Sequence, residues 1–267
     1  MIIDFHTHCF PDRLAARAMA MLSAGIGCKP FFDGTLGGLK TRLGKAGISA
    51  AVVCNIATNE RQVKSVNDFA IAANGGNITS FGSIHPLFTD YKNEIDRLCA
   101  AGIKGLKFHP DYQNYFVDDE KMYPVYEYAS RKGMILLFHT GLDLGLMGVV
   151  KAPPDRFVNV VNTFPKAKIV AAHMGGYAYA GLTEYVLIGK DCYMDTSACL
   201  SSLTKRQAER MIKNHGVDKI LFATDLPWYR PEKEIRFVNS LNLTVEDKEK
   251  IYHKNAEKLL GGGDING

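Results

Sequence analysis

The sequence predicts an α/β fold, a single-domain (β/α)8 TIM barrel, and three observations carry this prediction. Short apolar segments rich in Ile, Val, Leu and Phe alternate with helical patterns along the 267 residues. These segments do not alternate strictly in polarity, which is typical of strands buried on both faces. There are eight of them, and eight parallel strands joined by helical crossovers close naturally into a barrel.

The expected strands are short and apolar. In chain order they are Ile2–Phe5, Ala50–Cys54, Ile78–Ile84, Gly105–Phe108, Ile135–Phe138, Lys168–Ala171, Cys192–Met194 and Ile220–Ala223. The helical stretches between them repeat apolar residues every three or four positions. They are Leu14–Leu22, Arg61–Ala73, Asp90–Ala101, Pro124–Lys132, Pro154–Thr163, Gly181–Lys190, Thr204–His215 and Val245–Leu260. Asn59 is the expected N-cap of the second helix, and Pro154 begins the fifth in the position that proline favours.

The barrel is expected to span residues 1–260, followed by a glycine-rich, frayed tail at residues 261–267. The long first connection, residues 9–47, is expected to lie like a lid over the C-terminal mouth, where barrel active sites are built. It could instead plug the bottom or side of the barrel. The main rival fold is an open doubly wound sheet. That fold usually has a glycine-rich phosphate loop after its first strand, where this chain has His-Thr-His.

Composition excludes several classes of protein. Hydrophobic residues make up 46% of the chain and the formal net charge is +4, with no long run of like charges, so we expect no nucleic-acid partner. No secretory signal or membrane-length apolar run is evident, so we expect no membrane partner. The 6 cysteines are scattered without a CxxC pair, which favours free thiols and a cytoplasmic location. A homo-oligomer remains open.

His6 and His8 close the first expected strand. Their spacing of two places both rings on one face, with Asp4 one step deeper. Two imidazoles fill an apolar core poorly because each carries polar nitrogens that need partners, but they suit a borderline cation. This pair alone leaves open a buried histidine pair whose nitrogens are satisfied by hydrogen bonds.

The same pattern recurs where other strands end. His139 follows the fifth strand, His173 the sixth and Asp225 the eighth, while Lys107 and His109 close the fourth. Because the carboxyl ends of barrel strands converge, these side chains are expected to meet. Their recurrence favours a metal site over isolated core histidines.

The motifs DFHTH, GLKFHP, FHTG, AHMGG, YMDTS and FATDLPW, with the ending NAEKLL, are spread over nearly the whole chain. In these the sequence resembles the amidohydrolase superfamily, and within it the amidohydrolase-related (amidohydrolase-2) group of TIM-barrel metal enzymes. The resemblance implies that His6, His8, His139 and Asp225 bind one metal ion. It implies that His173 points at the substrate or completes a second metal site. The group includes hydrolases, non-oxidative decarboxylases and hydratases.

Three imidazoles, one carboxylate and a water make an open catalytic site that suits a divalent metal, most of all zinc. The ion would lower the pKa of its water. Asp225 and His173 are the expected catalytic residues, Asp225 moving the proton and His173 polarising the substrate or, alternatively, holding a ligand in place. One ion is favoured and two remain open. Lys107 could bridge two ions if carboxylated, or act as a cation toward substrate, and His109 could bind substrate or only support the loop.

We therefore predict a hydrolase that uses metal-activated water on a small amide, ester or lactone. The alternative is a non-oxidative decarboxylase of an aromatic or unsaturated carboxylic acid with the same site. A non-catalytic metal-binding protein and a TatD-like deoxyribonuclease are weaker rivals, since the latter needs a glutamate on strand three, which ends instead at His85. Specificity is expected from mouth residues: Lys29, Phe31, Phe32, Tyr112, Tyr115, Tyr177 and Trp228–Arg230.

Overall fold

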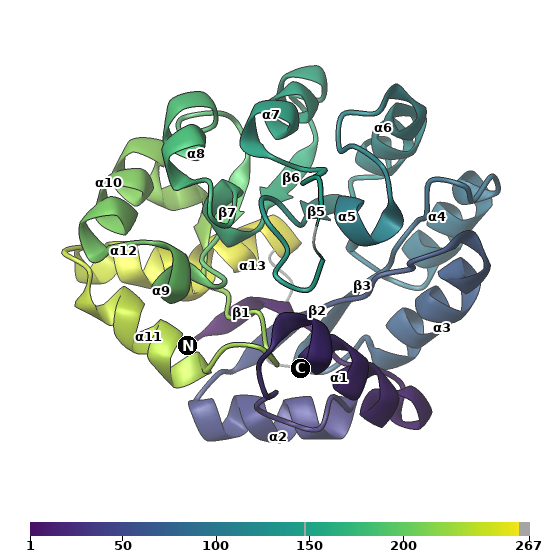
Figure 1. Ribbon diagram of the computed structural model, residues 1–267, viewed down its shortest axis with the longest axis horizontal. Helices are drawn as coiled ribbons and strands as arrows, with labels where there is room; N and C mark the ends of the chain where they lie inside the picture. The colour runs from purple at the N-terminus through teal and green to yellow at the C-terminus, as the bar shows by residue number, and fades with distance from the viewer. Residues whose placement is uncertain (147, 262–267) are drawn as a thin grey trace.

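The computed structural model is a closed ring of parallel strands surrounded by helices (Figure 1). It describes residues 1–146 and 148–261, without the side chain of Leu200. The strands are β1 Ile3–Thr7, β2 Ala50–Cys54, β3 Ile78–Phe81, β4 Gly105–Phe108, β5 Ile135–Phe138, β6 Lys168–Ala171, β7 Tyr193–Asp195 and β8 Ile220–Leu221. The (β/α)8 barrel predicted from the sequence is confirmed, and four strands have the expected bounds.

Two runs of strands make the barrel. The orders β1-β2-β3 and β4-β5-β6-β7-β8 are parallel throughout. A bridge between Gly82 and Leu106 joins the runs on one side, and a bridge between Thr7 and Leu226 closes the ring on the other. The closure includes the bonds from Phe5 N to Phe222 O (2.8 Å) and from Asp225 N to His6 O (2.9 Å). Residues from the two ends of the chain are thereby brought together.

The α-helices are α1 Asp12–Ile26, α2 Leu36–Ala46, α3 Val63–Ala73, α4 Tyr91–Ala100, α5 Pro110–Gln113, α6 Tyr123–Arg131, α7 Pro154–Thr163, α8 Ala180–Val186, α9 Cys199–Ser202, α10 Lys205–His215, α11 Pro231–Ser240, α12 Val245–Glu249 and α13 Asn255–Leu260. Short 3-10 turns are η1 Glu60–Gln62, η2 Glu120–Met122, η3 His173–Gly175 and η4 Val217–Lys219, and η5 Lys250–Lys254 is a π-helical turn. No helix within the described residues is long and apolar enough to span a membrane.

Several expected bounds were wrong for identifiable reasons. β1 extends to Thr7 because it gains pairing from the segment after β8. The glycine-containing helix α2 has weak propensity and was not predicted; Thr35 caps it by accepting from Gly38 N, and its Leu39 and Leu43 are buried. Helix α11, which begins at Pro231, was also missed. The expected helix Val245–Leu260 is interrupted by the turn η5.

Apolar residues bury the strands on both sides, as their composition predicted. One buried cluster consists mainly of strand residues such as Phe5, Val52 and Leu137. A larger cluster packs strand residues against the surrounding helices, including Leu98 of α4 and Phe157 of α7. The strand ends are thus held rigidly by apolar packing, which is what lets them carry a site.

The first connection supplies α1 and α2, and α1 lies over the barrel mouth in front of the strands (Figure 1). Residues of α1 line the cavity at that mouth. Within the first connection, residues 9–47, α1 is thus the part that lies at the mouth rather than at the barrel bottom, and its action as a lid stays a prediction. The expected frayed tail, residues 261–267, lies outside the described residues apart from Gly261, which caps α13.

The connection after β5 is tied to the one after β6 through Gly141. This residue has φ +86°, and Leu142 N donates to Tyr177 O at 3.0 Å while Tyr177 N donates to Thr140 O at 3.1 Å. A Cβ atom on Gly141 would lie 2.2 Å from the backbone nitrogen of Tyr177. Only glycine fits here, because both the dihedral angle and the neighbouring backbone exclude a side chain.

We predict that Gly141→Ala lowers the free energy of unfolding by about 3 kcal/mol, since it adds a backbone clash to an unfavourable positive φ. Gly133→Ala is the matched control: its φ is +75° but nothing lies within 4 Å of an added Cβ, so it should cost about 1 kcal/mol. Denaturant unfolding of both variants measures the difference. Equal losses would contradict the close approach of the two connections.

Candidate active site

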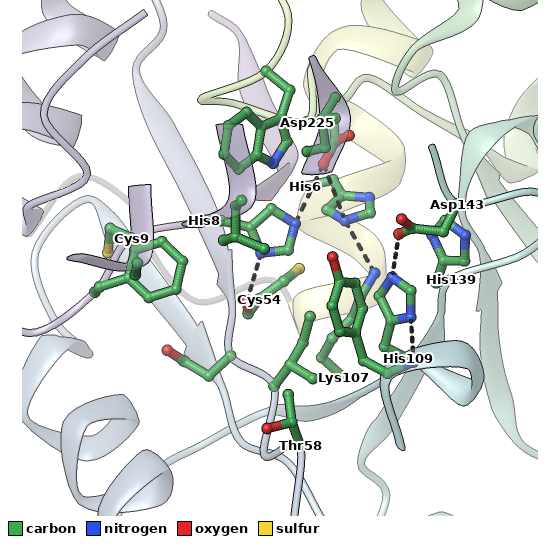
Figure 2. A pocket seen from close by; sticks show the side chains of 18 of the residues that line it. His6, His8, Cys9, Cys54, Thr58, Lys107, His109, His139, Asp143 and Asp225 are labelled. Atoms are coloured by element: carbon green, nitrogen blue, oxygen red, sulfur yellow. Dashed lines mark hydrogen bonds and ion pairs between the residues drawn. The ribbon is translucent and has the colours of Figure 1, made fainter. Parts of the chain in front are cut away.

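A cavity of about 670 Å³ opens at the C-terminal ends of the strands. All seven residues that the sequence singled out line it: His6, His8, Lys107, His109, His139, His173 and Asp225. Figure 2 shows imidazoles from several strands and the Lys107 ammonium directed toward one another. The convergence expected from the strand ends is therefore present in the fold.

Three ligand-type side chains meet where β1 approaches the segment after β8. His6 lies in β1, His8 directly follows that strand, and their ligand atoms and that of Asp225 all lie within 4.8 Å of one another. Oδ1 of Asp225 is 3.3 Å from Nε2 of His8 and 3.7 Å from Nε2 of His6. The closing hydrogen bonds of the barrel hold these two segments together.

The hydrogen bonds made by the Nδ1 atoms of His6 and His8 assign the tautomer of each ring. Nδ1 of His8 lies 2.9 Å from the carbonyl oxygen of Cys54, and Nδ1 of His6 lies 3.0 Å from Oδ2 of Asp195. Carbonyl and carboxylate oxygens only accept, so each Nδ1 donates and each Nε2 of a neutral ring is an acceptor. Both Nε2 atoms then face the Asp225 carboxylate, acceptor against acceptor. Such an arrangement calls for a cation between them.

Asp195, at the end of β7, also begins a chain of hydrogen bonds that runs through Ser197 and His173 to His139. Its Oδ1 accepts from the hydroxyl of Ser197, whose Oγ lies 2.8 Å from Nδ1 of His173. The single hydroxyl hydrogen goes to Asp195, so Ser197 accepts from His173. Nε2 of His173 is then an acceptor for Nδ1 of His139 at 3.0 Å. This leaves Nε2 of His139 as an acceptor, and that atom is buried without a hydrogen-bond partner among the described residues.

Asp195 thus orients two of the expected ligands at once. It fixes His6 directly, and it fixes His139 through Ser197 and His173. It also accepts from the backbone nitrogens of His173 (3.0 Å) and Ser197 (3.1 Å), which hold the carboxylate in place. Carboxylates behind metal-binding histidines raise ligand basicity and fix the ring orientation.

Lys107 is completely buried in β4, with its Nζ 3.0 Å from Nε2 of His6. Burial lowers the pKa of Lys107. Burial and the nearby Lys107 charge also lower the pKa of His6 well below its usual value, so this imidazole is neutral, as a metal ligand must be. The ammonium donates to the same nitrogen that would bind an ion, so Lys107 has to release His6 when an ion binds there. Carboxylation of Lys107 stays a prediction.

His109 belongs to a neighbouring group with His139 and Asp143. Nε2 of His109 lies 3.0 Å from Oδ2 of Asp143, and the three ligand atoms lie within 4.8 Å of one another. However, the rings of His109 and His139 stack at 4.1 Å with an interplanar angle of 9°. Imidazole lone pairs lie in the ring plane, so two parallel stacked rings cannot both direct them at one ion. In this arrangement His109 is a hydrogen-bonding partner of Asp143, and its role toward a second metal ion or the substrate stays a prediction.

Asp225 is held in an unusual backbone conformation, with φ +64°. Its nitrogen donates to His6 O, and Trp228 N donates to its carbonyl oxygen at 3.0 Å. Burial raises the pKa of Asp225, but its interactions with the neighbouring side chains of His8, His6 and His173 outweigh burial, so the net pKa is lowered. The side chain is therefore a carboxylate. Non-glycine residues with positive φ are uncommon and often mark functional positions.

Sequence reasoning missed two acids of this site. Asp195 ends β7 after an apolar run, so the pattern that singled out His139 and Asp225 applied equally to it. Asp143 lies in the connection after β5 and gave no signal.

The residues expected at the mouth are only partly in the cavity lining. Tyr112, Tyr177, Trp228 and Tyr229 line the cavity, whereas Lys29, Phe31, Phe32, Tyr115 and Arg230 do not. His85 is also outside the lining and accepts from Leu87 N in a local turn.

These residues fit a divalent metal ion. The acceptors on His6, His8 and Asp225 converge without enough hydrogens to satisfy one another, and Nε2 of buried His139 has no partner among the described residues. Neutral imidazoles with one carboxylate are the donor set of catalytic metal sites. The structure does not give a common centre for all four residues, so the fourth ligand remains a prediction.

A family model described as Amidohydrolase matches residues 3–262 of the chain. Among solved structures, an uncharacterised TIM-barrel protein from Bordetella bronchiseptica is 21% identical, with a TM-score of 0.77 over 97% of this chain and 98% of that one. A 5-carboxyvanillate decarboxylase from Novosphingobium aromaticivorans, solved with bound manganese and 3-methoxy-4-hydroxy-5-nitrobenzoic acid, is 14% identical, with a TM-score of 0.75 over 97% of each chain.

A 2,6-dihydroxybenzoate decarboxylase in complex with 2,6-dihydroxybenzoate is 16% identical, with a TM-score of 0.71 over 97% of this chain and 98% of that one. At these identities the structures show a shared fold alone. No curated protein matches the sequence.

We predict that Asp195→Asn weakens binding of a divalent ion by about 10-fold to 100-fold, because it removes the acceptor that fixes His6 and His139. Competition with a metal-binding dye measures the affinity. Asp191→Asn, the same change at an exposed residue paired with Lys219, is the control and should leave the affinity unchanged. An Asp195→Asn protein that binds the ion like the parent would contradict this role.

Proposed function

Starting from the membership of this chain in the amidohydrolase family of enzymes, we propose that it is a metal-dependent non-oxidative decarboxylase of a small aromatic carboxylic acid. One observation carries the proposal. The acceptor atoms of His6, His8 and Asp225 converge at the base of a cavity whose walls are mainly apolar and aromatic. With a divalent ion bound there, such a cavity would combine positive charge at its base with mainly apolar walls, and decarboxylation uses both.

The walls favour an aromatic substrate. Phe10, Phe69, Tyr112, Trp228 and Tyr229 line the cavity together with aliphatic side chains. Flat rings pack well against such side chains. A carboxylate moved from water into this setting loses hydration, whereas the carbon dioxide that leaves is neutral. Exclusion of water therefore favours the loss of carbon dioxide.

Positive groups at the base of the cavity would stabilise the negative charge that develops on the substrate. When bound, a divalent ion supplies Lewis-acid stabilisation of substrate oxygens. Lys107, buried beside His6, adds a cation that can face an anionic substrate oxygen once it leaves the imidazole. These positive groups stabilise the electron pair that stays on the substrate when the carbon–carbon bond breaks.

Asp225 is the residue best placed to move the proton. Both ring nitrogens of His173, the other candidate, are engaged by Ser197 and His139. The lowered pKa of Asp225 makes it a carboxylate that can take the proton of a substrate hydroxyl. It then returns this proton to the ring carbon as that carbon loses carbon dioxide, and the hydroxyl oxygen keeps the negative charge.

Structural neighbours add support, since two of those described above are decarboxylases of hydroxylated aromatic acids by their names. One of them holds manganese. We predicted zinc from the histidine-rich donor set, and manganese is the alternative ion to test. We favour a single ion, because the stacked rings of His109 and His139 are poorly arranged for a second.

Hydrolysis of an amide, ester or lactone is the second candidate. The observation that favours it is Asp225, a carboxylate beside the candidate metal ligands that could equally accept a proton from water. The same residues would serve either reaction. The two differ in whether water enters the product.

We expect the protein loaded with zinc or manganese to release carbon dioxide from one or more members of a panel of hydroxybenzoates, and to be inactive toward a matched panel of aryl esters, amides and lactones. Treatment with a chelator should abolish turnover, and re-addition of the ion should restore it. Hydrolysis without carbon dioxide release would replace the first candidate by the second. Turnover that survives complete metal removal would contradict both.

We also predict that Asp225→Asn lowers turnover about 1000-fold, because the amide cannot shuttle a proton. Since Asp225 is a proposed ligand as well, turnover should be divided by the metal content of each preparation. Asp191→Asn again serves as the control. An Asp225→Asn protein that is fully active per bound ion would refute the assigned role.

A further inference from the structure

Helix α1 turns one face toward the cavity. Arg13, Arg17 and Met21 follow one another at a spacing of four, so they lie one turn apart on that face, and all three line the cavity. Helix α3 and η1 contribute Ser65 and Gln62 to the same lining. The outer part of the cavity is therefore bounded by side chains of α1 and of this second segment.

The two arginines have no polar partner among the residues that the structure describes. Neither Arg13 nor Arg17 forms an ion pair or a side-chain hydrogen bond with any residue that the structure describes, whereas Arg42, Arg97 and Arg156 all pair with acids. Both are exposed. Each guanidinium thus keeps its donors free beside the cavity.

The acids of the cavity are already engaged elsewhere. Asp143 pairs with His109, and Asp225 faces His6 and His8 at the base. Asp12, the acid next to Arg13 in sequence, does not line the cavity. The charge contributed by α1 to the cavity is therefore positive and unbalanced.

We propose that Arg13 and Arg17 form a subsite for a second anionic group of the substrate, a carboxylate distant from the one lost at the cavity base. Guanidinium groups bind carboxylates through paired, charge-assisted hydrogen bonds. The substrate class is then a dicarboxylic acid whose apolar middle crosses the cavity. This inference names a substrate class for the proposed function, and it rests on that function only for the carboxylate that is lost at the cavity base.

The position of the subsite on α1 gives the first connection a chemical role. The end of α1 closely approaches the connection after β5, because a Cβ on Gly25 would lie 3.3 Å from the carbonyl oxygen of Gly145. Helix α1 is thus positioned against the segment that carries Asp143. An anionic group held by the arginines would be fixed relative to the base of the cavity.

Binding to the metal-loaded protein should be measured by calorimetry with straight-chain dicarboxylates from succinate to sebacate and with the monocarboxylates of equal length. We expect dicarboxylates above a threshold length to bind tighter than the matched monocarboxylates. Arg13→Gln and Arg17→Gln should each weaken dicarboxylate binding about tenfold, with little effect on monocarboxylates. The exposed Arg61, outside the cavity lining, provides the control Arg61→Gln with the same loss of charge.

Equal affinity for the two series, or an equal effect of Arg61→Gln, would overturn the subsite. The readout is binding, so it separates the two proposals. A dicarboxylate preference that depends on Arg13 and Arg17 supports the subsite even if no carbon dioxide is released, in which case the reaction alone fails. Carbon dioxide release from hydroxybenzoates without any such preference leaves the reaction standing and removes the subsite.

Discussion

The hydrogen bonding of Asp195 is the constraint on which the site depends. One oxygen of this buried carboxylate binds His6, and the other binds Ser197, which continues through His173 to His139. Burial lowers the pKa of His6 and of His139 well below its usual value, so each of these two imidazoles exists as one of two neutral tautomers. Asp195 selects the tautomer that leaves Nε2 as an acceptor. Without this selection the same side chains could occupy the same positions and still present hydrogens instead of lone pairs to an ion.

The barrel makes this selection possible because it joins distant segments at fixed positions. Backbone hydrogen bonds between β1 and the segment after β8 place Asp225 against His6, although the two are separated by most of the chain. The pairing of β6 with β7 places Asp195 beside His173 in the same way. Packing on both faces of the strands holds these ends rigidly. The connections above the strands are less constrained by the core, and there α1 adds a different kind of chemistry, two exposed arginines that pair with none of the described residues and lie beside an apolar wall.

The ammonium of Lys107 and a metal ion compete for the same nitrogen of His6. Its ammonium hydrogen-bonds the nitrogen of His6 that a metal ion would use, so protonation of the lysine and binding of an ion oppose each other. Burial, which lowers the pKa of Lys107, shifts this competition toward the ion. The lysine released from His6 would remain buried beside the substrate. A single residue can thus stabilise the metal-free protein and serve the reaction in the metal-bound one.

The sequence by itself determined the barrel, most strand positions and seven polar residues among those that line the cavity, because apolar strand segments and the polar residues that end them are local patterns. It failed where tertiary contacts override local preference, as in the glycine-containing helix α2, and where a residue gives no pattern, as for Asp143. Only the tertiary structure decided which histidine nitrogen faces which neighbour, that His109 stacks on His139, and that Arg13 and Arg17 are unpaired within the described part of the chain. These depend on side-chain hydrogen bonds and ring orientations between segments far apart in the chain, and no spacing along one strand encodes them.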